Sequence, residues 1–413
     1  MRTAPRIELP INKIEDFASS VTELPIGTEK PGNTFVEFFA GIGLIHAALE
    51  PLGWTCLLAN DNARDKVISY RANYPSTPLS SLDIRHLAID DIPSSDLATA
   101  SFPCIDLSQA GGRVGINGDH SGIVWSFLDH IAGLKQIGLA PRFLFLENVA
   151  GLLTLHDGAS IDLLLNEIVK LGYAIDLVQV DARHFTPQAR NRVFVIGVRN
   201  WECDSKLAMP DTHIRRYKVR EVWQRNPHLP WIFFDFPSLP KLSLPLEDVL
   251  EDLPENDPRW WDSERMEYFW AHLEHDHRPK LEAMLAAKAD LQMTAMRRGR
   301  RRGLREQIFN LRFDGLASCL RTAAGGSSIQ FIVRVRNGRV QVRKILSVES
   351  GRLQGVCLAD SMPNFSYPPA ETTALSAFGD AVCVPAVRWV FANSIQKVAS
   401  GTVQSRQGQL TLI

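Results

Sequence analysis

The segment Thr34–Glu50 is the part of the chain that most constrains its fold. An apolar run rich in β-forming residues meets two glycines, Gly41 and Gly43, and a helical pattern follows. The order strand, tight turn, helix is the first unit of an α/β fold that brings a ligand close to the turn. The dinucleotide fingerprint requires a third glycine at position 46, where this chain has His46, so the sequence disfavours NAD.

Later strands end in polar or reactive residues in the same way. Ligands of doubly wound sheets bind outside the carboxyl ends of the strands, so we expect these residues to meet at one cleft. An acid after the second strand is also where such folds hydrogen-bond a ribose diol. Each acid taken alone could instead be a helix cap or part of a solvated turn. The predicted strand-end residues are Gly41 in the first unit, Asp61 and Asn62 after Trp54–Ala59, Asp83 and Ile84, Cys104 after Asp96–Phe102, and Glu147 after Pro141–Leu146.

The thiol of Cys104 follows Pro103 directly, on a loop that begins where a strand ends. Proline restricts its own φ and biases the preceding residue toward extended structure, which favours presentation of the thiol at the strand end. A lone cysteine is more often a small buried hydrophobe than a nucleophile, so this pair is weak evidence without partners. Glu147 is a possible partner, because a partly desolvated carboxyl can donate a proton near neutral pH.

Three polar, planar side chains, Gln188, Arg190 and Arg192, lie at i, i+2 and i+4 before the strand Val193–Val198. In extended backbone they point to one face, which suits the holding of a planar base or a phosphate. The alternative is an ordinary surface strand.

The 413 residues exceed what one core usually serves, so two domains are expected. Six scattered cysteines without a Cys-x-x-Cys pair argue against a disulfide framework or a zinc ribbon and fit a reducing compartment. The sequence has no apolar run of membrane-spanning length and no signal-peptide pattern at its first residues. We therefore expect a cytoplasmic protein that needs neither a metal nor a membrane.

The net charge of −1 hides a strongly basic region between Arg297 and Lys344. This region holds thirteen Lys or Arg against two acids, which leaves +11 there and −12 on the rest of the chain. Half of these cations lie within Arg297–Arg305. A solvated charge run is one interpretation; a surface for a phosphate backbone is the other.

The pattern predicts four regions: an N-terminal extension (1–32), a catalytic cofactor-binding domain (33–199), a target-recognition domain (200–345) and a C-terminal region (346–413). After Asn200 the βα alternation stops and prolines and aromatic residues become dense. Ser263–Met296 is predicted as helical, and Phe331–Val342 as a hairpin turning at Asn337-Gly338. A helix from Ala374 to Ile395, interrupted by Gly379, is expected to pack back on the catalytic domain.

Taken in order, these motifs resemble those of the DNA (cytosine-5) methyltransferases from about Asn33 to Asn393, except in the variable middle. Two departures stand out. Ile105-Asp106 follows Pro-Cys where the family often has Gln, and Asp380 stands where Asn is usual and would repel the cofactor's carboxylate. The matching motifs are Phe38–Gly43, Asp61, Asp83, Pro103-Cys104, Glu147–Val149, Gln188-x-Arg190-x-Arg192, Arg343–Gly355 and Phe378–Val382.

The resemblance implies a Rossmann-like domain that uses S-adenosylmethionine, with a smaller, irregular, β-containing target-recognition domain. Cys104 would add to carbon 6 of a flipped cytosine, Glu147 would stabilise the adduct at ring nitrogen 3, and Arg190 and Arg192 would hold the nucleotide. The cofactor residues implied are Phe38, Ala40, Gly41, Gly43, Asp61, Asn62, Asp83, Ile84, Pro103, Asp380 and Ala381. The DNA-binding residues expected are Gln188, Arg297, Arg298, Arg300, Arg301, Arg302, Arg321, Ser327 and Ser328.

The resemblance further suggests a monomer that acts on a specific duplex DNA sequence, within a restriction-modification or anti-phage system. Two alternatives stay open. One is a tRNA cytosine methyltransferase of the same fold, against which the long region from 200 to 340 argues. The other is a non-catalytic DNA-binding homologue, against which the presence of Cys104, Glu147 and Arg190 argues.

Overall fold

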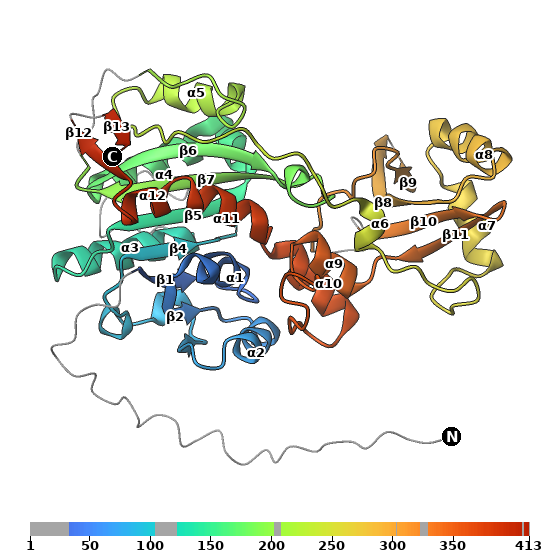
Figure 1. The fold of residues 1–413 in the computed structure, drawn as a ribbon, viewed down its shortest axis with the longest axis horizontal. Coiled ribbons are helices and arrows are strands. Elements are labelled where there is room, and N and C mark those ends of the chain that lie inside the picture. Colours follow the sequence, from blue (N-terminus) through green and yellow to red (C-terminus); the bar gives the residue numbers. More distant parts are fainter. Residues whose placement is uncertain are drawn as a thin grey trace, which may run out of the picture. The chain divides into compact units, whose positions relative to one another are not determined.

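A seven-stranded sheet in the order β3-β2-β1-β4-β5-β7-β6 dominates the computed structural model (Figure 1). All pairs along β3-β2-β1-β4-β5 are parallel, and β7 is antiparallel to both of its neighbours. This is the Rossmann-like α/β architecture that the sequence predicts. The strands are β1 (Thr34–Phe38), β2 (Thr55–Asn60), β3 (Leu79–Ser80), β4 (Leu97–Ala100), β5 (Phe143–Val149), β6 (Tyr173–Asp181) and β7 (Asn191–Arg199).

The structure describes residues 33–103, 122–201, 208–302, 304–322, 329–406 and 409–412, without side chains for 298–306 and 403–412. Every described residue belongs to one compact unit, Asn33–Ile413.

Two hydrophobic cores cover the two faces of the large sheet because its buried strands carry apolar side chains on both sides. One core joins Phe35 and Phe145 to Phe391 of the C-terminal region. The other joins Phe38 and Leu146 to Phe127. The helices of this part are α1 (Leu44–Leu49), α2 (Arg64–Asn73), α3 (Ile123–Gln136), α4 (Ala159–Lys170) and α5 (Tyr217–Arg225).

The C-terminal helices return to the first helix of the chain. Helix α11 (Val384–Ala392), red in Figure 1, packs on the blue α1. The guanidinium of Arg388 donates to the carbonyl oxygens of Ala47 and Ala48, at 3.1 and 3.3 Å. Helix α11 therefore completes the core on the side of α1, next to the glycine turn. The other C-terminal elements are α9 (Ser347–Leu353), α10 (Glu371–Asp380), α12 (Ile395–Ala399), β12 (Val403–Arg406) and β13 (Gln409–Leu412).

A second sheet of four antiparallel strands, in the order β11-β10-β8-β9, is formed by residues between 291 and 344. Its apolar face packs with helices α7 and α8 around Phe309 and Phe331. Asn337 and Gly338 both have positive φ, of 52° and 70°, at the predicted hairpin turn. The elements are α6 (Leu246–Val249), α7 (Ser263–Ala271), α8 (Arg278–Ala286), β8 (Leu291–Arg302), β9 (Leu304–Leu311), β10 (Gln330–Arg336) and β11 (Arg339–Lys344).

Two predicted helices need correction. Ser263–Met296 holds two short helices, but Leu291–Met296 is strand, because pairing with β9 and β10 overrides the local preference for helix. The C-terminal helix breaks after Asp380, between α10 and α11, and Gly379 lies inside α10. Pro385 at the start of α11 fits this break, since proline is tolerated in the first turn of a helix.

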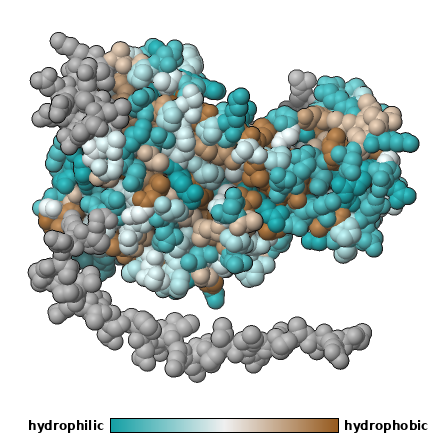
Figure 2. All heavy atoms as spheres, viewed as in Figure 1, coloured by the Kyte–Doolittle hydropathy of each residue, from teal (hydrophilic) through white to brown (hydrophobic). Residues whose placement is uncertain are grey.

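Among the described residues, one stretch, Glu371–Ala392, is long and apolar enough to cross a membrane by length and composition alone. It is the α10–α11 pair, and most of it is buried in the protein core. On the face drawn in Figure 2, hydrophobic residues are scattered among hydrophilic ones.

Candidate functional site

A cavity of about 900 Å³ opens at the carboxyl ends of the central parallel strands. Its wall is built from the residues that follow β1, β2 and β4, from the end of β5 and from the start of β7. Residues 319–322 and 377–382 complete it. This is the edge of the sheet at which the sequence predicts a cleft. Of the predicted site residues, Ala40, Gly41, Asp61, Asn62, Pro103, Glu147, Arg192, Arg321, Asp380 and Ala381 line it.

The glycine turn after β1 is held by Asp61. Gly41, at φ 59°, donates its N–H to Oδ2 of Asp61 at 2.8 Å, and Ala63 donates to Oδ1 at 2.9 Å. Gly43 has φ 87°, and a β-carbon there would lie 2.5 Å from the ring of Tyr74. The two glycines therefore serve different needs. Gly41 adopts a left-handed turn in open space, whereas Gly43 also lets the turn approach an aromatic ring.

The phenylalanine that lines the cavity is Phe39, whereas Phe38, the residue expected to contact the cofactor, does not line it. Phe38 is fully buried, with its ring edge-on to that of Phe127 at 5.3 Å. Phe39 has a positive φ of 55° and lines the cavity. A phenylalanine rarely adopts this backbone, and such strain is concentrated at binding sites.

Asp83 and Ile84 do not reach the cavity wall, and neither does Gly43. The carboxylate of Asp83 faces Arg85, 2.7 Å away, and the hydrogen bonds from Arg85 lower the pKa of Asp83. Asn62, which lines the cavity, donates weakly to Asp83 at 3.4 Å. Ile84 is buried, and its carbonyl oxygen bonds the ring of His130. The side chain of Asn62 therefore lies between Asp83 and the cavity, and Ile84 belongs to the hydrophobic core.

Glu147 is buried at the cavity wall, with 4 % of its surface exposed. Its Oε2 accepts a 2.7 Å hydrogen bond from the hydroxyl of Ser101, and its Oε1 lies 2.9 Å from Nε of Arg192. The ion pair with Arg192 is not aligned as a hydrogen bond, so Oε1 keeps an acceptor position. The neighbouring Asn148 donates to the carbonyl oxygen of Phe102 and fixes β5 against the loop that leads to Pro103.

Gln188 and Arg190 are buried braces in this structure, so the predicted contacts of their side chains with DNA do not fit. Gln188 is fully buried, and its amide bonds the backbone of Leu353 and Leu320. Arg190 is 1 % exposed, and its guanidinium donates to the carbonyl oxygens of Leu320, Gly379 and Ala381. Burial lowers the pKa of Arg190 to about 10. The alternating pattern identifies a shared face correctly, but that face is packed inside the protein.

Cys319 lines the cavity beside both arginines, and the sequence analysis did not select it. Its sulfur lies 3.5 Å from Nη1 of Arg190 and 3.9 Å from Nη1 of Arg192. Burial acts to raise the pKa of this thiol, but the two guanidinium groups outweigh burial and lower it. No local motif marks this residue, because the two guanidinium groups nearest to its sulfur come from residues 190 and 192, far earlier in the chain. Phe39, Lys66 and Ser101 were missed as well, although each lies within five residues of a predicted strand-end residue.

The remaining predicted residues divide between described and undescribed parts. Pro103 lines the cavity, whereas Cys104, Ser327 and Ser328 lie outside the described residues. Asp380 forms a 2.9 Å ion pair with Lys66 at the cavity. The basic run belongs to β8, where Arg300 pairs with Glu306 and Arg301 with Arg305 in the backbone register; Arg297, Arg298 and Arg302 belong to the same strand.

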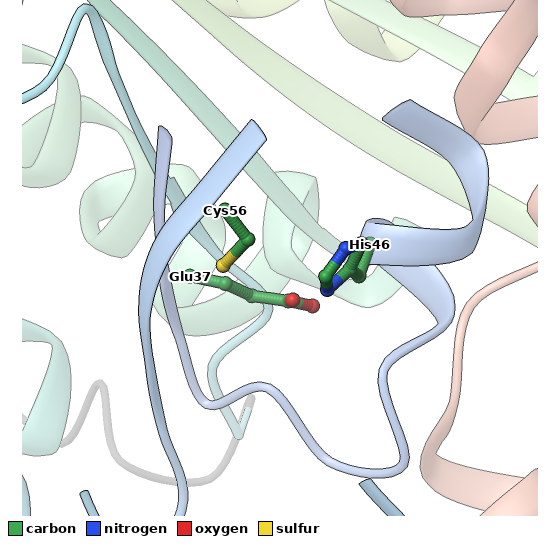
Figure 3. A group of neighbouring side chains, drawn as sticks. All are labelled: Glu37, His46 and Cys56. Atoms are coloured by element: carbon green, nitrogen blue, oxygen red, sulfur yellow. The ribbon is translucent and has the colours of Figure 1, made fainter. Parts of the chain in front are cut away.

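A buried polar cluster is formed by Glu37 of β1, His46 of α1 and Cys56 of β2, the elements that flank the glycine turn (Figure 3). Their ligand-type atoms lie within 4.8 Å of one another, so the group could in principle hold a metal. The hydroxyl of Tyr70, however, lies 2.8 Å from His46 Nδ1, 3.4 Å from Glu37 Oε2 and 3.7 Å from Cys56 Sγ. Burial raises the pKa of the Cys56 thiol, which disfavours the thiolate that metals bind. We interpret the cluster as a hydrogen-bonded support for the turn.

Burial also shifts the pKa values of the other two groups of this cluster. It raises the pKa of Glu37 to about 8 and lowers that of His46 to about 4, because the charged form of each is poorly solvated. Both groups are therefore largely neutral at pH 7. Glu37 also lines the cavity, and its Oε1 has no hydrogen-bond partner among the described residues.

Comparison with known proteins gives consistent results. The sequence profile described as C-5 cytosine-specific DNA methylase matches residues 33–397. Type II methyltransferase M.Bsp6I of Bacillus sp. (strain RFL6) is 26 % identical over 86 % of this chain and 96 % of its own length. Type II methyltransferase M.BsuFI of Bacillus subtilis is 34 % identical, but over 40 % of this chain and 39 % of its own length.

Solved structures agree in fold. The Dnmt2 methyltransferase of S. pombe superposes with a TM-score of 0.55 at 14 % identity, over 89 % of this chain and 99 % of that protein. The Entamoeba histolytica methyltransferase EhMeth gives 0.54 at 13 % identity over the same shares.

Proposed function

Because the chain belongs to the C-5 cytosine-specific DNA methylase family, we propose that it methylates carbon 5 of cytosine within a specific sequence of duplex DNA. The burial and the hydrogen-bonded position of Glu147 are the observation that carries this proposal. Glu147 is a buried carboxyl, held by Ser101 and Arg192, on the cavity wall that Pro103 also lines. Cys104 follows Pro103 directly in the sequence, which supports the proposal that its thiol and Glu147 act on the same base.

The residues of the cavity fit S-adenosylmethionine. Asp61 offers carboxylate oxygens at the end of β2, Phe39 offers an apolar ring in a strained backbone, and the volume of about 900 Å³ admits such a ligand. We propose that these two residues, with Gly41 and Pro103, hold it. When bound, the cofactor supplies a methyl group on a positively charged sulfur.

The protein groups would then act on the cytosine. Carbon 5 is a poor nucleophile until the Cys104 thiolate adds to carbon 6 and generates an enamine. Glu147 would donate a proton or a hydrogen bond to ring nitrogen 3, which stabilises that adduct. After methylation, loss of the proton on carbon 5 expels the thiol. A base stacked in a duplex cannot reach the thiol, so flipping it out costs a few kcal/mol.

The basic strands would supply the attraction for the phosphate backbone. Arg321 is exposed and lines the cavity, and the Arg297–Arg305 run lies in β8 and β9. Six phosphate contacts give a slope of about −5 in log affinity against log salt concentration for duplex DNA. Gln188 and Arg190 are left out of this surface because their described contacts are internal.

Transfer of labelled methyl from S-adenosylmethionine to duplex DNA and to tRNA tests the proposal. We expect labelled DNA, unlabelled tRNA, and no transfer by Cys104→Ala that has kept its fold. Trapping of the wild-type chain on a duplex containing 5-fluorocytosine tests the covalent adduct. Labelling of tRNA alone would favour the alternative substrate, and absence of both transfer and trapping would favour a non-catalytic DNA-binding protein.

We further propose a monomeric, cytoplasmic modification enzyme that accompanies a restriction or anti-phage system. The support is similarity to type II methyltransferases such as M.Bsp6I. Bisulfite sequencing of DNA from cells that express the chain would identify the methylated sequence. Protection of that DNA from a restriction enzyme of the same specificity would link the modification to defence.

A further inference from the structure

The ion pair between Lys66 and Asp380 joins two distant parts of the chain across the cavity. Lys66 lies in the first turn of α2, and Asp380 is the last residue of α10. Nζ and Oδ2 are 2.9 Å apart, the two side chains are 26 % and 45 % exposed, and both residues line the cavity. The pair is therefore open to solvent and to any ligand in the cavity.

Stability alone does not explain this pair. A solvent-exposed ion pair contributes little to folding. Asp380 also stands at the C-terminus of a helix, where the helix dipole disfavours a negative charge. Two neighbouring carbonyl oxygens, of Gly379 and Ala381, already accept from Arg190, so this helix end is secured without Asp380.

A ligand that bears a carboxylate would explain why Lys66 and Asp380 are paired at the cavity. Asp380 stands where the family usually has Asn, and its side chain would repel the cofactor's carboxylate if it faced that group directly. A lysine ammonium has three N–H donors, and the hydrogen bond to Asp380 uses one of them. The remaining donors and the positive charge are available to a second carboxylate at the same place.

We propose that Lys66 binds the carboxylate of the amino-acid portion of S-adenosylmethionine, and that Asp380 is a positioning residue that directs the Lys66 ammonium into the cavity. This inference rests on the proposed function, since it requires that cofactor. Under this proposal a lysine of α2 recognises the carboxylate. Asp380 then contributes to cofactor binding by orienting that lysine, although its own charge is negative.

A comparison of two ligands distinguishes carboxylate binding by Lys66 from a general disturbance of the cavity. S-adenosylhomocysteine carries the carboxylate, and 5′-methylthioadenosine lacks the whole amino-acid portion. Calorimetric titration of the full chain with each should show that Lys66→Met weakens S-adenosylhomocysteine about tenfold, as loss of a charged hydrogen bond does. The affinity for 5′-methylthioadenosine should stay within twofold.

A double variant tests the role of Asp380. In Lys66→Met the uncompensated Asp380 repels the ligand, so Lys66→Met/Asp380→Asn should recover part of the affinity for S-adenosylhomocysteine. Lys66→Arg should keep most of it. Lys218→Met is the matched control, because Lys218 forms a 2.8 Å pair with Glu221 on the exposed part of α5, away from the cavity. Thermal unfolding midpoints verify that each variant is folded.

The outcomes are distinguishable. An equal loss for both ligands, or no loss for S-adenosylhomocysteine, would overturn the inference while leaving the proposed function intact. A wild-type chain that binds neither ligand would overturn both. A double variant weaker than Lys66→Met would overturn the positioning role of Asp380.

Discussion

Glu147 and Arg192 approach each other within 2.9 Å across the antiparallel pair β5–β7. The antiparallel direction of β7 brings the start of one strand beside the end of the other, so the proposed base-stabilising acid and a cation share one wall of the cavity. The same arginine approaches the sulfur of Cys319. Glu147, Arg192 and Cys319 therefore form a small network of polar and charged groups on this side of the cavity.

Glu147→Gln should lower the rate of methyl transfer by about 10²–10⁴-fold, because the amide cannot act as a general acid. The affinity for S-adenosylhomocysteine should change less than twofold. Single-turnover transfer and calorimetry measure the two quantities. Glu167→Gln, which alters an exposed pair with Lys170 on α4, is the control. An affinity loss as large as the rate loss would indicate a structural role for Glu147.

Gly43→Ala should destabilise the protein more than Gly53→Ala. Both positions have positive φ, of 87° and 82°, so both variants carry backbone strain of roughly 1–3 kcal/mol. At Gly43 the added carbon would also lie 2.5 Å from the Tyr74 ring, whereas at Gly53 no atom of the part of the chain that the structure describes lies within 4 Å of it. Urea unfolding compares the two variants. Equal losses would show that Tyr74 moves aside without cost.

Stability should fall as pH rises between 7 and 8.5, and Glu37→Gln should flatten that slope. Burial raises the pKa of Glu37 to about 8, so the folded protein keeps a proton that the unfolded chain releases above its ordinary value of 4.5. Stability from this group is therefore lost as pH rises through the folded pKa, by about 1 kcal/mol over this window.

His46 does not interfere with that measurement. Burial lowers its pKa to about 4, so its contribution varies with pH only between about 4 and its ordinary value of 6.5. Chemical unfolding at both pH values gives the slope for the wild type and for Glu37→Gln. If stability falls equally with pH in the wild type and in Glu37→Gln, the pH dependence comes from another group.

Glu349→Gln should lower the free energy of unfolding by about 3–5 kcal/mol, since it leaves the fully buried Arg343 without its countercharge. Glu349 also accepts from the backbone N–H groups of Glu251 and Leu346, both at 2.8 Å. Glu282→Gln removes the exposed pair with Arg278 and should cost under about 1 kcal/mol. Similar values for both variants would contradict the assignment of a buried, essential pair.

The order of strands and helices in the large sheet could be predicted because each unit shows an apolar strand, a turn and a helical pattern. Asp61 and Glu147 were identified by the same logic, since a residue that follows a parallel strand lies at the ligand edge. The four-stranded sheet was only partly predicted. Its strand β8 begins with Leu291–Met296, whose composition favours a helix, and pairing with distant strands decides the outcome.

Within the site, the failures have two physical causes. Alternation shows that Gln188 and Arg190 share a face, but whether that face is buried depends on residues 317–320 and 353–381, far along the chain. Phe38 was chosen in place of Phe39 because the strand alternation stops at Phe39, whose positive φ redirects its side chain. The second cause is that some contacts join residues far apart in the sequence. The Lys66–Asp380 ion pair and the approach of Cys319 to Arg190 and Arg192 are of this kind.

The packing of α11 on α1 has a consequence for synthesis. Arg388 reaches back 341 residues to the carbonyl of Ala47, and Phe391 meets Trp54 edge-on at 5.1 Å. A ribosome that adds about 5–20 residues per second takes on the order of tens of seconds to cover that distance. The apolar side of α1 therefore lacks this partner on the nascent chain until residues 384–392 have been made. We expect chaperones that shield α1 during that interval to raise the yield of folded protein.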